Sequence, residues 1–327
     1  MGDKRRAHLT LICGLFGILG ACSDAGSSDQ GTDGDQGWSD PVVLSRSLDR
    51  PTALGQDRFV LYVANEQGLV QLVPKDGGKG TTVAESFGLA ADLVVDGDDI
   101  YWLDATWGRV WTISVAGGGP SLMAITQDRP RRLAVDESYL CRIDDGGAVI
   151  RLSRAEELPQ TLSTGHLDLG DLCLDEKRVY FTDRQAGQVL AVPLIGGPVH
   201  YLALAQTQPQ GIAVDQLRVY WTTATAVMSL AIDEPDTEPE PEVVADQLST
   251  PGWLTAAGGY LYWSSTADGT VVRVPKTGGS VEVIATGQDQ PGALVVDSSA
   301  VYWLNHGTAA GTGTVQQAEY HFAEATD

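Results

Sequence analysis

Aspartates are the chemically active side chains with the most regular spacing in this chain. Six of them recur at intervals of 39 to 42 residues, and an alanine takes the seventh place. A ring of carboxylates at one end of a fold would bind a cation. Each carboxylate could instead cap the tight turn that follows it, and one such Asx-turn in each repeat explains the regularity. We favour the capping role for Asp57, Asp96, Asp136, Asp175, Asp215 and Asp297, with Ala257 in the remaining copy.

Local motifs of catalysis and of metal binding are not found. The five histidines are scattered, and no His-x-x-x-His or Glu-x-x-His pair is present to ligate a metal. The chain has no Gly-x-Ser-x-Gly elbow and no Gly-x-x-x-x-Gly-Lys phosphate loop. A serine triad is assembled in space, so the sequence leaves it open. We expect no catalytic residue, no metal ion and no cofactor.

The aspartates belong to a longer repeat that predicts four short strands in each unit. Five residues after most of the aspartates comes an aromatic pair, and a Gly-Gly turn between two apolar runs follows in four of the units. Both glycines of such a turn reach positive φ without steric cost, which is typical of a hairpin. Residues 100–103 and 301–304 are continuously apolar, and neighbours along a strand face opposite sides of a sheet. Both faces of these sheets should therefore be buried, as they are when blades stack around an axis.

The number of repeats predicts an all-β fold, a β-propeller of seven four-stranded antiparallel blades over residues 41–322. Residues 41–54 align without a gap on residues 281–294, so an outer strand precedes the first full unit. The last unit stops after a third strand near residues 313–320. We expect the strand at residues 41–46 to complete the last blade, because this pairing removes two exposed sheet edges. Six or eight blades are the alternatives.

The second strand of the unit resembles the YWTD repeat of lipoprotein-receptor (class B) propellers. The whole unit is similar to the repeats of β-propeller lipoproteins of bacteria, and this resemblance implies the architecture and no particular activity. Blade three departs from the motif, with Cys141 and Arg142 in place of Tyr-Trp. The copies that carry the resemblance are YWLD (101–104), YFTD (180–183), YWTT (220–223), YWSS (262–265) and YWLN (302–305).

Residues 1–21 have the pattern of a secretory signal peptide. Three basic residues precede an apolar run of 13 residues, 9–21, which is too short for a transmembrane helix. The run ends in Leu-Gly-Ala-Cys, which resembles the lipobox of bacterial lipoproteins and implies that Cys22 is acylated and holds the protein on a membrane. An ordinary secretory signal is the alternative. Residues 22–40, rich in Gly, Ser and Asp, predict a flexible tether.

A net charge of −22 argues against nucleic acid as a partner. We expect contact with the membrane through the lipid anchor only. Residues 233–242 (DEPDTEPEPE) predict an extended, solvated loop, and a site for a divalent cation or a basic partner is the alternative. Cys141 and Cys173 lie in adjacent repeats, so a disulfide between blades is one hypothesis for an oxidising compartment. We favour two free thiols that fill core positions.

The loops after the second and the fourth strand of each blade should open on one face, where we expect the ligand. Trp107 lies in the loop DATWGR and either anchors a partner or folds back on its own blade. Arg131 and Arg132 either face the ligand or pair with the surrounding acids. The candidate binding residues are Asp104, Trp107, Arg131, Asp183, Arg184, Asp268, Asn305 and His306, with Asn65, Asp144, His166 and Gln208 beside them.

The combined pattern favours an exported, membrane-anchored lipoprotein that acts as a non-catalytic binding module. We expect a protein or small-molecule ligand on one propeller face, a monomer, and a location at the outer membrane or the periplasmic side of the envelope. One alternative is an enzyme similar to seven-bladed streptogramin lyases or propeller lactonases, which hold a metal over the channel with His and Glu. The other alternative is a structural component of an envelope complex.

Overall fold

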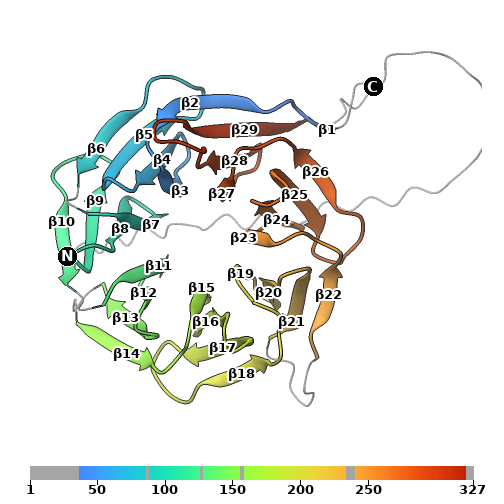
Figure 1. The fold of residues 1–327 in the computed structure, drawn as a ribbon. Helices are drawn as coiled ribbons and strands as arrows, with labels where there is room; N and C mark the ends of the chain where they lie inside the picture. Colours follow the sequence, from blue (N-terminus) through green and yellow to red (C-terminus); the bar gives the residue numbers. More distant parts are fainter. Residues whose placement is uncertain (1–36, 86–87, 126–127, 155–157, 233–239, 322–327) are drawn as a thin grey trace, which may run out of the picture. The chain divides into compact units, whose positions relative to one another are not determined.

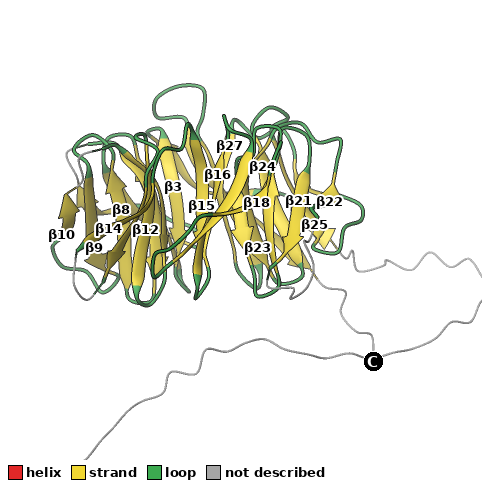
Figure 2. Ribbon diagram, turned by 90° about the horizontal axis from the view of Figure 1, so that it is seen from below, coloured by secondary structure: helices red, strands yellow, loops and turns green. Residues whose placement is uncertain are grey.

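The computed structural model describes residues 37–85, 88–125, 128–154, 158–232 and 240–321. They contain strands β1 to β29, arranged in seven sheets around a central axis (Figure 1). Seen from the side, the strands run between two faces on which the loops gather (Figure 2). The prediction of an all-β propeller with seven blades is confirmed. In these ranges we find no helix of the length and apolarity needed to cross a membrane.

Six blades are four-stranded antiparallel sheets whose strands follow chain order from the axis outward. Blade 1 contains β3 (Pro51–Gln56), β4 (Val60–Asn65), β5 (Leu69–Pro74) and β6 (Thr81–Glu85). Blade 2 contains β7 (Ala90–Asp96), β8 (Asp99–Asp104), β9 (Arg109–Ser114) and β10 (Ser121–Ile125). Blade 3 contains β11 (Pro130–Val135), β12 (Tyr139–Asp144), β13 (Val149–Ser153) and β14 (Pro159–Ser163).

The remaining three of these six blades have the same order of strands. Blade 4 contains β15 (Leu169–Leu174), β16 (Arg178–Asp183), β17 (Gln188–Pro193) and β18 (His200–Ala203). Blade 5 contains β19 (Ile212–Val214), β20 (Arg218–Thr222), β21 (Val227–Ala231) and β22 (Glu242–Ala245). Blade 6 contains β23 (Pro251–Ala257), β24 (Tyr260–Ser265), β25 (Thr270–Pro275) and β26 (Glu282–Ala285).

Blade 7 closes the ring by combining the two ends of the described chain. In β2, Val43 lies opposite Gln316 and Ser45 lies opposite Val315. The N-terminal strand therefore completes the last blade, as the sequence predicted, and no sheet edge is left at the closure. The strands of this blade are β27 (Pro291–Val296), β28 (Ala300–Asn305), β29 (Gly313–His321) and the outer strand β2 (Val42–Leu48).

A short additional strand, β1 (Gly37–Trp38), also pairs with β29. The ring of Trp38 packs edge-to-face on Tyr320 with centroids 5.2 Å apart. The propeller therefore includes Gly37 and Trp38, which we had assigned to the tether that ends at residue 40. The composition of the segment, rich in Gly, Ser and Asp, gave no sign of this aromatic contact. The predicted signal peptide, Cys22 and most of the tether lie outside the described residues, as does most of the acidic run 233–242.

The two faces of the ring differ in their connections. We call the face with the connections between blades and between second and third strands the loop face. The opposite face, with the turns after the first and third strands, is the turn face. The Gly-Gly turns lie on the turn face, and both glycines have positive φ, as at Gly77 (85°) and Gly78 (135°). These turns confirm the hairpins that the sequence predicted.

The hydrophobic core is divided into seven clusters, one at each junction between neighbouring blades. In blade 2, Tyr101 packs against blade 3, whereas Trp102 packs against blade 1. The equivalent Trp221, Trp263 and Trp303 are, like Trp102, at most 1 % exposed. Replacing such a buried aromatic residue with alanine costs about 3–5 kcal/mol. The aromatic pair is therefore a main support of each junction, and both faces of the sheets are buried as predicted.

Blade 3 replaces this aromatic pair with Cys141 and Arg142, and both side chains are buried. Arg142 donates a hydrogen bond to the buried carboxylate of Asp144 at 3.1 Å, which compensates its charge. Cys141 and Cys173 are both free thiols, in agreement with the interpretation we favoured. Burial raises the pKa of each thiol. These cysteines therefore act as core residues.

The regularly spaced aspartates cap turns on the turn face. Oδ1 of Asp175 accepts the backbone N–H groups of Lys177 and Arg178, each at 2.7 Å, and Oδ2 accepts the hydroxyl of Tyr180 at 2.7 Å. At Asp96 the turn contains Gly97 with a positive φ, and the carboxylate binds Arg154 instead. The capping role is thus confirmed for Asp57, Asp136, Asp175, Asp215 and Asp297.

At three junctions a basic side chain from the following blade completes this arrangement. Lys75 donates to Asp297 at 2.8 Å and lies 4.9 Å from the ring centroid of Tyr302. Lys276 contacts Asp215 and Tyr220 in the same way, and Arg154 contacts Asp96 and Tyr101. Each of the three bases directly follows the third strand of its blade. We call this contact the aspartate–tyrosine–base tie, and it joins neighbouring blades on the turn face.

Hydroxyl groups in the third position of the YWTD-like motif join blades near the loop face. Thr182 donates to the carbonyl of Gln210 at 2.7 Å, and Ser264 donates to the carbonyl of Gly292 at 2.8 Å. In each pair the acceptor belongs to the innermost segment of the next blade. The motif residue therefore satisfies a backbone group at the channel wall, which is a structural role.

We expect the substitution Lys75→Met to lower the free energy of unfolding by about 1–3 kcal/mol at pH 7. Burial opposes ionisation of Asp297, but the Lys75 ammonium and the N–H groups of Ser299 and Ala300 outweigh it and lower the pKa of this carboxyl to about 2. The pair therefore stabilises the fold above about pH 4 and loses its effect as the pH falls toward 2. Urea unfolding at several pH values measures this difference.

The control is Lys79→Met, which removes an exposed lysine from the adjacent turn. Its effect should stay below about 0.5 kcal/mol. A Lys75→Met effect as small as that of the control, or one that grows on acidification, would show that the tie does not stabilise the junction.

Candidate functional site

The candidate site lies at the mouth of the central channel on the loop face. The innermost segments of the blades line the channel, and the residue in their third position changes type from blade to blade. Blades 2, 3 and 4 place an aspartate, an arginine and an aspartate there, whereas blade 6 places a tryptophan. The residues in chain order are Ala53, Asp92, Arg132, Asp171, Gly211, Trp253 and Ala293.

Arg132 and Trp253 meet across the channel. Cζ of Arg132 lies 4.3 Å from the centroid of the Trp253 ring, and their strands β11 and β23 lie on opposite sides of the ring of blades (Figure 1). A guanidinium at this distance from an indole makes a favourable cation–π contact. Both residues line a cavity of about 460 Å³ that Thr52, Arg131 and His306 also line. The pair crosses the channel at this cavity, so we call the pair the floor and the cavity the cup.

Two carboxylates flank Arg132, the buried one of Asp92 and the partly buried one of Asp171. Oδ1 of Asp171 lies 3.7 Å from Nε of Arg132. Asp92 accepts the N–H groups of Leu93 and Leu133 at 2.9 and 2.8 Å, and the second bond also joins blade 2 to blade 3. Burial raises the pKa of Asp92 to about 6, although Arg132 and these N–H groups oppose the rise. Burial raises the pKa of Asp171 as well. The charge beside the floor therefore changes when Asp92 takes up a proton.

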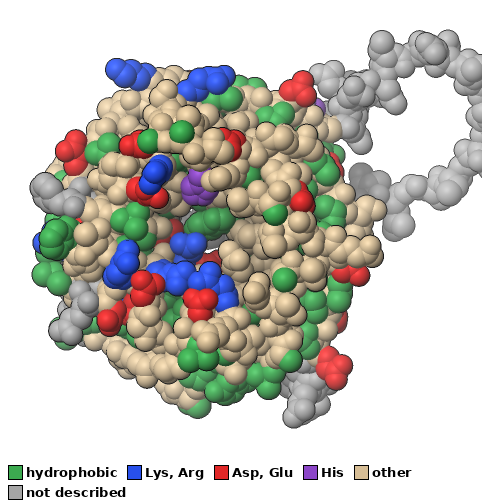
Figure 3. Space-filling view, viewed as in Figure 1, with side chains coloured by type: hydrophobic (Ala, Val, Ile, Leu, Met, Phe, Trp, Pro, Cys, Tyr) green, Lys and Arg blue, Asp and Glu red, His purple; other side chains and the backbone are tan. Residues whose placement is uncertain are grey.

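Two arginines, Arg131 in the cup wall and Arg184 beside the cup, are held by aspartates. Arg184 donates two hydrogen bonds to Asp168, from Nε at 2.9 Å and from a terminal nitrogen at 2.5 Å. Arg131 lies 3.4 Å from Asp168 and 3.4 Å from Asp145. Burial opposes ionisation of Asp168, but the two arginines outweigh it and lower its pKa. Figure 3 shows basic and acidic side chains side by side around the central hollow. The wall thus presents both signs of charge to a ligand.

His306 forms another part of the wall, from the loop between β28 and β29. Gly292 allows its close approach, because a Cβ at this glycine would lie 2.3 Å from Nε2 of His306. Burial lowers the pKa of His306, and a hydrogen bond with the backbone of Pro51 opposes this effect. The ring is therefore neutral at pH 7, where it offers one donor or acceptor atom without a charge.

Several predicted binding residues shape their own loops instead. Asp104, Asp183 and Asn305 hold the last position of the YWTD-like motif and are at most 3 % exposed. Oδ1 of Asp104 accepts the N–H groups of Thr106 and Trp107, both at 3.0 Å. Asp183 accepts three backbone N–H groups, and Asn65 and Asp144 cap their loops in the same way. These side chains are not available to a ligand, which corrects their assignment to the binding face.

Three other predicted residues lie on the rim. Trp107 is 56 % exposed and has the guanidinium of Arg109 at 5.9 Å from its ring centroid, so it does not fold into the core. Asp268 is exposed in the loop between β24 and β25, and Gln208 is exposed before blade 5. None of the three lines the cup. Of the candidates, Arg131 and His306 line the cup, and Asp168 joins Arg184 to Arg131.

Ser163 and His166 form a polar pair on the same face. Oγ of Ser163 lies 2.7 Å from Nε2 of His166, but Nδ1 of His166 lies 3.9 Å from Asp183, which is too far for a hydrogen bond. Burial lowers the pKa of His166, and Asp183 opposes this effect. The arrangement lacks the oriented base of a serine triad. Over the described ranges, no group of three or more His, Cys, Asp and Glu side chains could hold a metal ion.

The cup residues that sequence reasoning missed are Asp92, Asp171 and Trp253, together with the partners Asp145 and Asp168. Their signal lies in the variable positions of the repeat, which we set aside in favour of the shared ones. The third position of the innermost segment carries Asp92, Asp171 and Trp253. That Arg132 touches Trp253 could not be read from the alignment, because 121 positions separate them and only closure of the ring brings them together.

No family model and no curated protein sequence matches this chain. Solved structures with the same fold include a virginiamycin B lyase from Staphylococcus aureus, with 11 % identity and a TM-score of 0.72 over 87 % of this chain and 100 % of that one. BamB from Moraxella catarrhalis has 16 % identity and a TM-score of 0.57 over 82 % and 86 % of the two chains. A nidogen/laminin complex has 18 % identity and a TM-score of 0.54 over 66 % and 89 %. These likenesses show the β-propeller fold alone.

We expect the carboxyl group of Asp92 to titrate near pH 6 in the folded protein. Since this pKa lies above the ordinary value of about 4, the stability that the neutral form contributes is complete below pH 4 and is lost as the pH rises through 6. NMR of the aspartate carboxyl carbons measures the midpoint, and the spectrum of Asp92→Ala identifies the resonance. A midpoint below about pH 5 would mean that Arg132 and the backbone donors outweigh burial.

Proposed function

We propose that this protein is a lipid-anchored, non-catalytic binding module of the cell envelope that holds its ligand in the cup. The observation that carries the proposal is the contact of Arg132 with Trp253, which crosses the channel at the cup. The cup has a volume of about 460 Å³. Concave sites of this size with a few converging polar groups are usual places for ligands. The surrounding strands are fixed on both sides, so little ordering is needed on binding.

The chemistry of the cup suits a ligand that carries both hydrogen-bond donors and acceptors. Arg129 and Arg131 line it together with the carboxylates of Glu66 and Asp145. Both arginines pair with Asp145, Arg129 at 4.0 Å and Arg131 at 3.4 Å, and Glu66 pairs with Arg50 outside the cup. A ligand with a large net charge would leave wall groups of one sign unpaired, which is costly. A zwitterionic or neutral polar small molecule, or a polar loop of a protein, fits better.

The place where the chain joins the propeller supports display of the cup away from the membrane. Strand β1 pairs with the last residues of β29 on the turn face, whereas the cup opens on the loop face. Residues 23–36 separate Cys22 from this strand, and 14 residues extend at most about 50 Å. Acylation of Cys22 would therefore attach the lipid on the side of the propeller opposite the cup.

The comparisons support this proposal through the fold only. One of the similar structures is a complex of nidogen with laminin, in which a propeller takes part in a protein–protein assembly. The lyase likeness corresponds to the enzymatic alternative. We rank that alternative lower because no cluster of potential metal ligands lies among the described residues, and because the charged groups of the cup hold one another. An envelope complex that uses the cup is included in the proposal.

A photoreactive phenylalanine analogue at Trp107 should crosslink a protein partner in intact cells. Trp107 is exposed on the loop-face rim, next to the cup, so it lies within reach of a bound protein. The matched control places the same analogue at Phe59, which is 70 % exposed on the turn face. Blotting for adducts measures the yield. Equal labelling from both positions, or labelling from Phe59 alone, would argue against the cup face as the binding face.

The substitution Cys22→Ala tests the anchor. We expect the protein to move from the membrane fraction to the soluble envelope fraction, because acyl chains provide the only membrane attachment that we propose. Labelling with a clickable fatty acid should fall to background in the variant. The control Cys13→Ala, within the predicted signal, should keep both the label and the membrane fraction. Unchanged fractionation of Cys22→Ala would refute the lipid anchor.

A further inference from the structure

One blade lacks the aspartate on which the aspartate–tyrosine–base tie depends. Ala257 of blade 6 stands where every other blade carries an aspartate. The base of the tie is missing from this junction as well. In blade 7 the strand register places Tyr320 at the position that Lys276 holds in blade 6. Tyr262, the repeat tyrosine of this junction, thus has neither tie partner. A copy that departs from the repeat pattern often marks a functional site, and the junction of blades 6 and 7 is such a copy.

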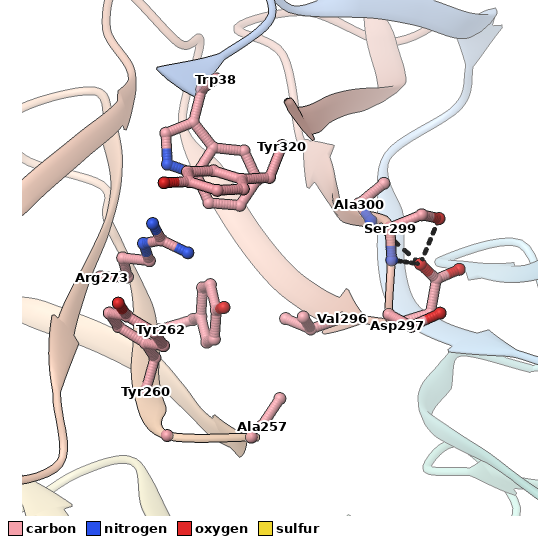
Figure 4. Close-up of a pocket in the computed structure, with 13 residues that line it drawn as sticks. Trp38, Ala257, Tyr260, Tyr262, Arg273, Val296, Asp297, Ser299, Ala300 and Tyr320 are labelled. Atoms are coloured by element: carbon pink, nitrogen blue, oxygen red, sulfur yellow. Dashed lines mark hydrogen bonds between the residues drawn. The ribbon is translucent and has the colours of Figure 1, made fainter. Parts of the chain in front are cut away.

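The two replacements leave a cavity of about 580 Å³ between blades 6 and 7 on the turn face (Figure 4). Three other junctions also lack the base, but the aliphatic residues Val115, Leu194 and Ile232 pack into their hydrophobic clusters. Tyr320 does not fill the space in this way, because its ring turns to Trp38. Ala257 lies at one end of the cavity in Figure 4 and leaves room for a larger group.

Three hydrogen-bond donors, from Arg273, Tyr262 and Trp38, line one side of this cavity. The side chain of Arg273 is 7 % exposed, and its Nε donates to Glu282 at 2.6 Å, while its terminal nitrogens point toward the open space (Figure 4). The guanidinium of Arg273 also interacts with the hydroxyl of Tyr262, which has no aspartate to receive its proton. The indole N–H of Trp38 is buried without a partner in the described structure. Buried hydrogen-bond donors normally have acceptors, so a ligand in this cavity should carry a hydrogen-bond acceptor.

The aromatic residues around the cavity exclude a cationic ligand. Cζ of Arg273 lies 4.2 Å from the ring centroid of Tyr260, 4.6 Å from that of Tyr320 and 4.7 Å from that of Trp38. The guanidinium therefore already occupies the cation–π positions of these rings and would repel a second cation. Across the cavity, Val296 provides an apolar wall. A flat apolar ring with an anionic acceptor group matches both features.

We propose that the cavity between blades 6 and 7 binds a small carboxylate with a flat apolar ring. The ligand carboxylate stands where the other blades place their own aspartate, beside Ala257, and accepts hydrogen bonds from Arg273 and Tyr262. The ring lies between Tyr262 and Val296. A charge-assisted pair with a guanidinium is the strongest recognition that this chain offers a carboxylate. The site is on the face opposite the cup and is independent of the function proposed for the cup.

The test is calorimetric titration of the folded protein with 2-naphthoate. We expect saturable binding by the wild type at millimolar concentrations or below. The variant Ala257→Asp should bind at least about tenfold more weakly, because its own carboxylate then occupies the donors. Its thermal unfolding midpoint should rise, because the missing half of the tie is restored. Tyr262→Phe, which removes one donor and keeps the ring, should also weaken binding several-fold.

Three controls test whether 2-naphthoate binds in this cavity and through its carboxylate. Ala116→Asp adds the same charge at an exposed turn of blade 2 and should leave the affinity unchanged. The neutral analogue 2-naphthamide should bind at least about tenfold more weakly than the acid. Arg131→Ala alters the cup and should not affect 2-naphthoate.

The outcomes decide the matter in either direction. Loss of binding in Ala257→Asp and retention in Ala116→Asp and Arg131→Ala would support the site. No saturable binding by the wild type up to about 10 mM would overturn the proposal. Equal affinities of the wild type and Ala257→Asp would overturn it as well. Loss of binding in Arg131→Ala alone would place the probe in the cup, which would overturn this proposal while leaving the function proposed for the cup intact.

Discussion

Burial of both faces of every blade is the constraint on which the rest of the structure depends. In a typical blade the repeat tyrosine packs against the next blade and the aromatic residue after it packs against the preceding one, so no blade is complete without two neighbours. A linear stack of such sheets would leave two apolar faces exposed. The chain avoids this by closing the stack into a ring, and it seals the ring by pairing β2 with β29. Since the core lies at the junctions, the channel edge and the loops are free to vary.

Both proposed sites follow from that freedom. The cup is built from positions of the innermost strands that differ between blades, among them the third position, where Arg132 and Trp253 meet. The second cavity arises where one blade omits the aspartate that ties the others, leaving Ala257 beside an unused set of donors. Each repeat shows what the architecture requires at a given position. Where one copy departs from this requirement and the ring still forms, the residues at that position are available for ligand binding.

Charge is handled locally even though the chain as a whole is strongly acidic. The buried Arg142 lies against Asp144, Lys75 lies against Asp297, and the arginines in the cup wall and beside it lie against their own aspartates. At physiological salt the field of distant exposed charges is screened within about 8 Å. The groups that line each cavity therefore decide what it binds, and the net charge of −22 mainly restricts large polyanionic partners.

The amino-acid sequence by itself determined the number of blades, their strands, the closure by the N-terminal strand and the capping aspartates. These features are visible in the sequence because they are local patterns or because they recur from repeat to repeat. It assigned Asp104, Asp183 and Asn305 to the binding face because their loops lie there. It could not show that these side chains are buried, with the two aspartates bonded to backbone N–H groups and Asn305 bonded to Gln288. Only the tertiary structure brought Arg132 to Trp253 and exposed the space beside Ala257. Those contacts depend on the curvature of the closed ring, a property that no single repeat contains.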